Sequence, residues 1–167
     1  MTASPHYTPA TEHDLEVLEQ QLGRPMRGVL GIGARCVCGN PVVVVTAPRL
    51  EDGTPFPTLY YLSHPAATAE MSRLEVAHLM VQMQDALAED EELRAAYQRA
   101  HEQYLRERES VAHVEEIAHV TAGGMPTRVK CLHALAAHSL AAGPGVNPMG
   151  DWALRESRWS IDRCQCA

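Results

Sequence analysis

No segment of this chain limits the choice of fold as much as the four consecutive valines that follow Pro41. β-Branched side chains favour strands, and a strand that is apolar on both sides has to be covered on both faces. Residues 28–36 and 58–62 are also of β type, and Gly39 with Asn40 supplies the positive φ that a tight connection needs. The sequence therefore predicts a small antiparallel sheet of about three strands, with the valine strand in the middle.

Helical patterns lie on both sides of these strands. Thr11 followed by Asp14 is typical of a helix start, leucines then repeat at helical spacing, and Gly23 ends the helix. Further helices are expected over residues 63–88, from Asp90 to about residue 105, and over residues 127–142. Residues 108–122 fit no single pattern.

Together these segments predict an α+β fold, with the sheet packed against three to four helices. A length of 167 residues fits one domain. We expect this domain to span residues 11–167 behind a flexible arm at residues 1–10. A chain of this size buries enough surface to fold without disulfides or metal.

The charge balance excludes some partners. A net charge of −7 without a basic stripe argues against binding to nucleic acid or to an anionic membrane. No apolar run approaches the ~18 residues needed to cross a bilayer. Residues 1–9 lack the basic and apolar parts of a secretory signal, so we expect a cytoplasmic protein. A homodimer is an open alternative to core packing for one apolar stripe, which comprises Met71, Met80, Met83 and Leu87.

Five cysteines without a secretory signal do not indicate a disulfide framework. Cys36 and Cys38 flank the first strand connection, His64 lies at a strand-to-helix junction, and Cys131 lies in a later helical segment. Zinc takes four nitrogen or sulfur ligands in a tetrahedron, and these residue types supply them. Each residue alone is more often an ordinary buried thiol or core histidine.

Helix spacing pairs no histidine with Cys131. His133 is two residues away and would face another side of the helix, and His138 is about 10.5 Å away along the axis. The sequence therefore predicts a zinc site where the turn of Cys36 and Cys38 meets the helix that carries Cys131. The predicted ligands are Cys36, Cys38, His64 and Cys131, with Cys164 replacing or supplementing one of them and Cys166 an incidental thiol.

Two classes of function remain open for this site. The first and preferred one is a non-enzymatic metal-binding protein with a binding or adaptor role, whose ion is fully enclosed by protein ligands. The alternative is a metal-dependent hydrolase, or an iron–sulfur redox or sensor protein, using the same residues. A Cys–His acyl-transfer site, with Cys131 as nucleophile and His133 or His138 as base, has no further signature to support it.

A glycine pair before the last predicted helix suggests a second site. Gly123 and Gly124 would expose backbone N–H groups at a helix start, where Arg128 and Lys130 add positive charge. This arrangement suits a phosphate, a carboxylate or an acidic group of a partner. A plain glycine turn with solvated basic residues explains the segment equally simply, and the Walker spacing is absent.

Several blocks resemble one bacterial family. They are residues 35–41, 47–50, 52–62, 122–126, 128–133 and 142–148, followed by Gly150 and Asp151. Over residues 12–165 the chain resembles the family known as domain of unknown function 501, which is typical of actinobacteria and implies no established activity. The resemblance implies that relatives carry a cysteine in place of His64 and another near Cys164. Zinc tolerates such an exchange of cysteine for histidine, which makes a four-thiolate iron–sulfur cluster less favoured.

Overall fold

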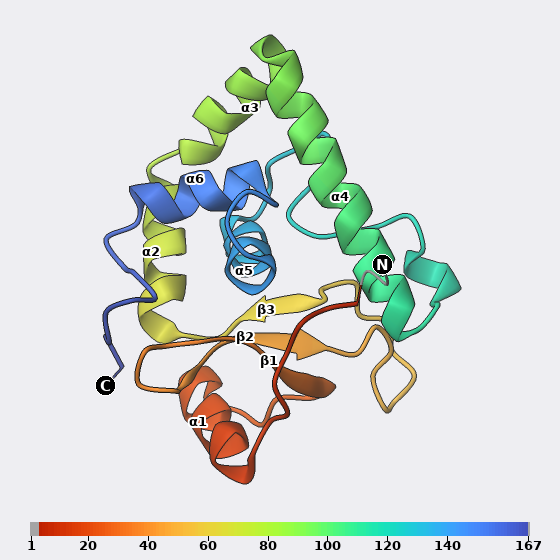
Figure 1. Cartoon of the computed structure of the whole chain (residues 1–167), viewed down its shortest axis with the longest axis vertical. Helices are drawn as coiled ribbons and strands as arrows, with labels where there is room; N and C mark the ends of the chain where they lie inside the picture. The colour runs from red at the N-terminus through yellow and green to blue at the C-terminus, as the bar shows by residue number, and fades with distance from the viewer. Residues whose placement is uncertain (1–3, 167) are drawn as a thin grey trace.

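A computed structural model describes residues 4–166 of the chain. Its sheet has three antiparallel strands in the order β1 (Val29–Arg35), β2 (Pro41–Thr46) and β3 (Tyr60–Leu62). Every residue of β2 is buried. Helix α5 packs on one face of the sheet and α1 lies on the other, so the valine strand is covered on both faces as predicted (Figure 1).

The described residues contain six α-helices. Helix α1 lies alone on one side of the sheet, and the other helices gather on the opposite side (Figure 1). This arrangement confirms the α+β class, with more helices than the sequence indicated. They are α1 (Glu12–Leu22), α2 (Pro65–Val76), α3 (Leu79–Glu89), α4 (Glu91–Val111), α5 (Leu132–Ala142) and α6 (Pro148–Glu156), with a 3-10 turn at Glu115–Ile117.

Two differences account for the larger number of helices. The helix expected over residues 63–88 is broken into α2 and α3, because His78 adopts a left-handed conformation with a φ of 61°. Helix α6 was not predicted, although its start carries a recognisable signal. The Asn147 side chain accepts hydrogen bonds from the N–H groups of Met149 and Gly150, and Pro148 occupies the first turn.

Helix α5 begins five residues later than the predicted start at residue 127. The N–H group of Arg128 bonds to the Gly124 carbonyl, and that of Lys130 bonds to the Gly123 carbonyl. These bonds fold residues 123–131 into a tight loop, and Cys131 is the extended residue that caps the helix. The late start changes where the side chain of Cys131 points.

Helix α1 confirms its predicted signals. Thr11 and Asp14 form a reciprocal capping box, and Gly23 ends the helix in a left-handed conformation. Of the arm predicted at residues 1–10, residues 1–3 lie outside the described residues. Thr8 exchanges backbone hydrogen bonds of 3.0 and 2.8 Å with Ile32 of β1.

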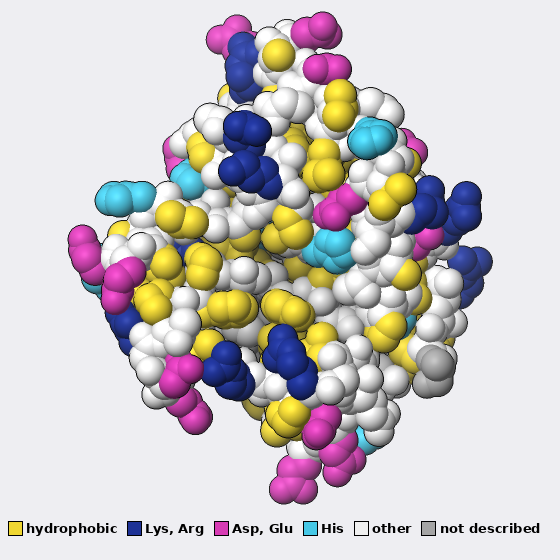
Figure 2. Space-filling view, turned by 180° about the vertical axis from the view of Figure 1, so that it is seen from behind, with side chains coloured by type: hydrophobic (Ala, Val, Ile, Leu, Met, Phe, Trp, Pro, Cys, Tyr) yellow, Lys and Arg dark blue, Asp and Glu magenta, His cyan; other side chains and the backbone are white. Residues whose placement is uncertain are grey.

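The main core lies between the sheet and the helices on its α5 side. Met71, Met83 and Leu87, from the stripe considered for a homodimer, are buried in it. Among residues 4–166, none of the helices combines the length and the hydrophobicity of a transmembrane span. The face drawn in Figure 2 is hollowed near its middle, where hydrophobic side chains gather beside a histidine and an acidic side chain.

Candidate metal centre

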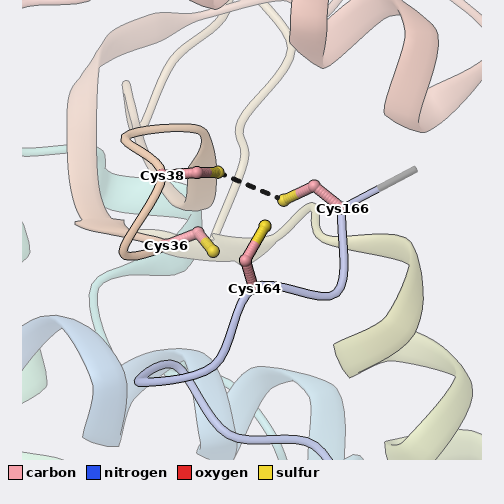
Figure 3. Close-up of side chains that lie close together, drawn as sticks. All are labelled: Cys36, Cys38, Cys164 and Cys166. Carbon is pink, nitrogen blue, oxygen red and sulfur yellow. Dashed lines mark hydrogen bonds between the residues drawn. The ribbon is translucent and has the colours of Figure 1, made fainter.

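Four cysteines from two segments far apart in the sequence meet beside the β1–β2 connection. The sulfur atoms of Cys36, Cys38, Cys164 and Cys166 all lie within 4.8 Å of one another. Figure 3 shows the two side chains of the turn facing the two of the C-terminal segment, and the sulfurs of Cys38 and Cys166 are 3.6 Å apart. Cys36 is buried, Cys166 is half-buried, and Cys38 and Cys164 are exposed.

The turn that carries the first pair is fixed by its backbone. The N–H group of Cys36 bonds to the Asn40 carbonyl at 2.9 Å, and the N–H group of Gly39 bonds to the Cys36 carbonyl at 2.8 Å. Gly39 has a φ of 94°, which a residue with a side chain rarely adopts. Arg35 donates to the Gly39 carbonyl and holds the turn from outside. Both thiols are therefore presented from a rigid hairpin end.

The second pair arrives on the segment that follows α6. Trp159 is buried with 3% of its surface exposed, and its ring lies 5.5 Å from the ring of His64. The backbone N–H group of Arg158 bonds to the Glu70 carboxylate at 2.7 Å. These contacts lead the chain across α2 and bring Cys164 and Cys166 to the turn.

His64 lies at the edge of this cluster. Its Nδ1 accepts a hydrogen bond from the Ala66 N–H group, which also caps α2. In the neutral ring the hydrogen is therefore on Nε2, which lies 3.2 Å from the sulfur of Cys166. Burial lowers the pKa of His64 and so favours this neutral form. The ring is placed to donate to the Cys166 sulfur, as histidines and amides around metal-bound thiolates do.

The thiols differ in their acidity in the absence of an ion. Burial raises the pKa of Cys36 and raises that of Cys166 to about 12. A hydrogen bond from the Asn40 backbone N–H group lowers the pKa of Cys38 to about 7. A bound metal cation would offset the cost of burying thiolates, because its positive charge stabilises them. Each thiol that becomes a ligand therefore loses its proton when the metal binds.

The distances are compatible with a single metal ion. Zinc–sulfur bonds of about 2.3 Å in a tetrahedron keep the sulfurs about 3.8 Å apart. The 3.6 Å between Cys38 and Cys166 is close to that value. Four thiolates are also the donor set that zinc and iron–sulfur centres share.

The structure brings together three of the five predicted ligands. Cys36, Cys38 and Cys164 are joined by Cys166, which the sequence interpretation had set aside. His64 contacts Cys166 and is not one of the four converging donors. The signal that was missed is a repeat, because Cys164-Gln-Cys166 has the same Cys-x-Cys spacing as Cys36-Val-Cys38.

Cys131 lies in a different cluster, with Glu75 of α2 and His133 of α5. The sulfur of Cys131 is 3.9 Å from Nδ1 of His133, which is 3.0 Å from Oε1 of Glu75. The prediction that Cys131 and His133 face different sides was wrong, because Cys131 precedes the helix and helical spacing does not apply to it. The turn of Cys36 and Cys38 therefore meets the C-terminal segment, and not the helix that Cys131 precedes, in the four-cysteine cluster.

This second cluster has its own electrostatics. The hydrogen bond of His133 to Cys131, together with the charge of Glu75, raises the pKa of His133 to about 8. Burial opposes ionisation of Cys131, but hydrogen bonds from His133 and from the Ala134 N–H group outweigh it and lower the pKa of the thiol.

The segment predicted to bind an anion uses its backbone internally. The N–H groups of Arg128 and Lys130 bond to the carbonyls of Gly124 and Gly123. The first N–H group of α5, that of Leu132, bonds to Oε1 of Glu75 at 2.9 Å. A carboxylate of the protein itself therefore occupies the position at the helix start, and binding of an external anion stays a prediction.

Comparison with known families gives one match. Residues 32–155 match the family described as "Protein of unknown function (DUF501)". Curated proteins and solved structures gave no match. The matched segment includes Cys36, Cys38 and the second cluster, and it ends before Cys164. Because this match covers most of its 167 residues, the chain belongs to the DUF501 family of proteins of unknown function.

Proposed function

We propose that this protein binds one zinc ion through Cys36, Cys38, Cys164 and Cys166, and that the ion has a structural role. The convergence of four sulfurs within 4.8 Å, from two segments far apart in the sequence, carries this proposal. The two pairs are separated by more than 120 residues and come from a hairpin turn and a segment without regular structure. An ion at this point fastens the C-terminal segment to the sheet.

A structural role follows from the number of ligands. Four protein thiolates complete the tetrahedral shell of zinc and leave no position for water or substrate. A hydrolase needs that open position, so the ion proposed here supports a binding or adaptor protein in preference to a hydrolase. Its physiological partner is a separate question, and the loop of Arg128 and Lys130 remains the candidate surface for an acidic partner.

Zinc is preferred over an iron–sulfur cluster because of the short distances between the four cysteine sulfurs. In a four-iron cluster each thiolate binds a different iron, which keeps the sulfurs further apart than around a single ion. The compact group seen here fits one ion better. We place the protein in the cytoplasm, where four reduced thiols persist.

The test is metal analysis and an absorption spectrum of the full chain purified without chelator or oxygen. We expect one zinc per chain and no visible absorption band. Cys38→Ser and Cys164→Ser remove exposed sulfurs, so they should lose the zinc without a packing defect of their own. Cys131→Ser is the matched control, because it removes a cysteine outside the four-cysteine cluster and should retain the zinc.

Each other result has a definite meaning. A brown protein with iron and sulfide would replace zinc by a redox centre at the same residues. Metal-free, folded protein with five free thiols would refute the metal site altogether. Zinc that survives both Cys38→Ser and Cys164→Ser would show that the ion binds elsewhere.

A further inference from the structure

The second cluster fixes the positions of its protons. Nε2 of His133 lies 3.1 Å from the Thr68 carbonyl oxygen and 3.2 Å from the Ser72 hydroxyl. The carbonyl oxygen can only accept, so Nε2 carries a hydrogen. Oε1 of Glu75 already accepts from the Leu132 N–H group at 2.9 Å, and it lies 3.0 Å from Nδ1 of His133. An acceptor at this position requires a hydrogen on Nδ1 as well. His133 is therefore held as an imidazolium ion.

The imidazolium ion stands next to a thiol at a helix start. The sulfur of Cys131 is 3.9 Å from Nδ1 of His133, and Cys131 caps α5, an eleven-residue helix whose N-terminus is partially positive. Both features favour the thiolate over the thiol, while the carboxylate of Glu75 opposes them. The Glu75 carboxylate also lies within 4.8 Å of the sulfur, but Nδ1 of His133 is at 3.9 Å and its ring carries the opposite charge.

The spacing here differs from that of the four-cysteine cluster. Two nitrogen or oxygen ligands of one zinc, with bonds of about 2.0–2.1 Å, lie about 3.3 Å apart. Nδ1 and Oε1 are 3.0 Å apart, which is the length of a hydrogen bond. The two atoms are therefore spaced as the partners of a direct hydrogen bond.

A cavity of about 340 Å³ opens beside this thiol. Cys131, His133 and Ala134 form one wall, and β3 and the end of α1 form the others. Apart from Cys131 and His133, none of the side chains that line it carries a charge. The volume suits a small molecule, and the uncharged lining suits an uncharged one.

We propose that Cys131 is a nucleophile that takes an acyl group from a small uncharged substrate bound in this cavity. The sulfur of Cys131 forms a bond to the carbonyl carbon, and the bond from that carbon to the leaving oxygen or nitrogen breaks. The leaving atom takes the proton of His133 Nδ1, which in the free protein is donated to Oε1 of Glu75. Water then cleaves the thioester, which releases a carboxylic acid and returns the proton to the thiolate–imidazole pair.

Two observations select acyl transfer over thiol–disulfide exchange. Exchange needs a second, resolving thiol, and the four other cysteines are gathered in the separate cluster. A proton donor beside the sulfur serves a leaving alcohol or amine, which departs poorly without a proton.

The first test is alkylation of the intact full chain with iodoacetamide, a small uncharged reagent, at pH 6. Peptide mass spectrometry follows each cysteine separately, with N-acetylcysteine as the reference thiol. Cys131 should react at least about tenfold faster than the reference, since an ordinary thiol is almost wholly protonated at this pH. His133→Gln should reduce that rate at least about tenfold. His119→Gln, at an exposed histidine, should leave it unchanged.

The second test uses p-nitrophenyl acetate. We expect a burst of one nitrophenolate per chain, with an acetyl group on Cys131, and no burst in Cys131→Ser. If Cys131 of the wild-type protein is alkylated no faster than N-acetylcysteine, the proposal is overturned, whatever the rates in the variants. Fast alkylation without an acetyl adduct would overturn the acyl assignment. Loss of a bound metal ion in Cys131→Ser would make the cluster a second metal site instead.

Discussion

At the scale of single residues, Asp14 links α1 to the turn of the metal centre. Its two carboxylate oxygens accept hydrogen bonds of 2.8 and 2.9 Å from Arg35, and Arg35 also donates to the carbonyl of Gly39 within the cysteine turn. The Arg35 guanidinium holds the pKa of Asp14 at about 2. One ion pair thus positions both a helix and the hairpin end.

Asp14→Asn should lower the free energy of unfolding at pH 7 by about 2 kcal/mol, because it removes charged hydrogen bonds between a buried carboxylate and a partly exposed guanidinium. A depressed folded-state pKa stabilises the protein above the unfolded value of about 3.9, and this contribution is lost as the pH falls towards 2. Urea denaturation at pH 7 and pH 2 measures both effects. The exposed pair of Arg27 and Asp52 offers the control Asp52→Asn, which should change nothing measurable. An equal loss at both pH values would contradict the argument.

His138 contributes a pH dependence of the same sign at higher pH. Its ring is fully buried between Tyr60 and Tyr104, with centroid distances of 5.6 and 5.1 Å, and burial lowers its pKa to about 4. Between about pH 6.5 and 4 the unfolded chain binds a proton that the folded chain does not, so stability falls as the pH falls through this window.

His138→Leu should therefore flatten the dependence of stability on pH. From pH 7 to 4.5 the free energy of unfolding of the wild type should decrease by about 2–3 kcal/mol more than that of the variant. His64 and His101 shift in the same direction, so only the difference between the proteins is informative. His119→Leu, at an exposed site, should keep the wild-type slope. Parallel slopes for His138→Leu and the wild type would refute the assignment.

At the scale of elements, α5 is the central helix. It contacts β3, α2 and α6, and its start carries both Cys131 and His133 (Figure 1). Helix α6 lies so close to it that a Cβ atom at Gly150 would be 2.1 Å from the Leu135 carbonyl oxygen. The glycine therefore sets the separation of the two helices.

Gly150→Ala tests this packing against helix propensity. In an exposed helix the change would add about 1 kcal/mol of stability. Here the obstacle is backbone that cannot move aside, so we expect a loss of about 2–4 kcal/mol in urea denaturation. Glu156→Ala, at an exposed position of the same helix, should stay near the wild-type value. A stabilised Gly150→Ala protein would show that the helices separate easily.

At the scale of the whole molecule, the proposed zinc ion joins the last residues of the chain to its first hairpin. Trp159 lies under this segment, in contact with His64, so it reports whether the segment stays in place. The ion contributes its binding energy to the folded state, because the unfolded chain presents no assembled site.

Removal of zinc by a chelator should lower the melting temperature by at least about 5 °C and shift the emission of Trp159 to longer wavelength. The Trp152→Phe background isolates the signal of Trp159. A chain that ends at Ile161 lacks the second cysteine pair and should melt near the chelated protein. If the purified protein contains zinc but its melting temperature does not change after the zinc is completely removed, the structural role of the ion is contradicted.

Some of the fold could be derived from local chemistry alone. The valine run required a strand covered on both faces, and the caps at Thr11 and Gly23 defined α1, because these signals act through neighbours in the chain. The same local signals predicted the three strands and their antiparallel order. The break at His78 carries no such signal, since the chain turns there to follow the packing of α2 and α3.

The sequence by itself determined which side chains are available for chemistry, namely five thiols and nine histidines in an acidic chain. It also indicated that some of the thiols would lie close together. Only the tertiary structure decided how they were divided. It brought Cys164 and Cys166 to the first hairpin and turned Cys131 towards His133 and Glu75. The physical reason is that these groupings depend on contacts between segments up to 128 residues apart and on the late start of α5, neither of which residue spacing encodes.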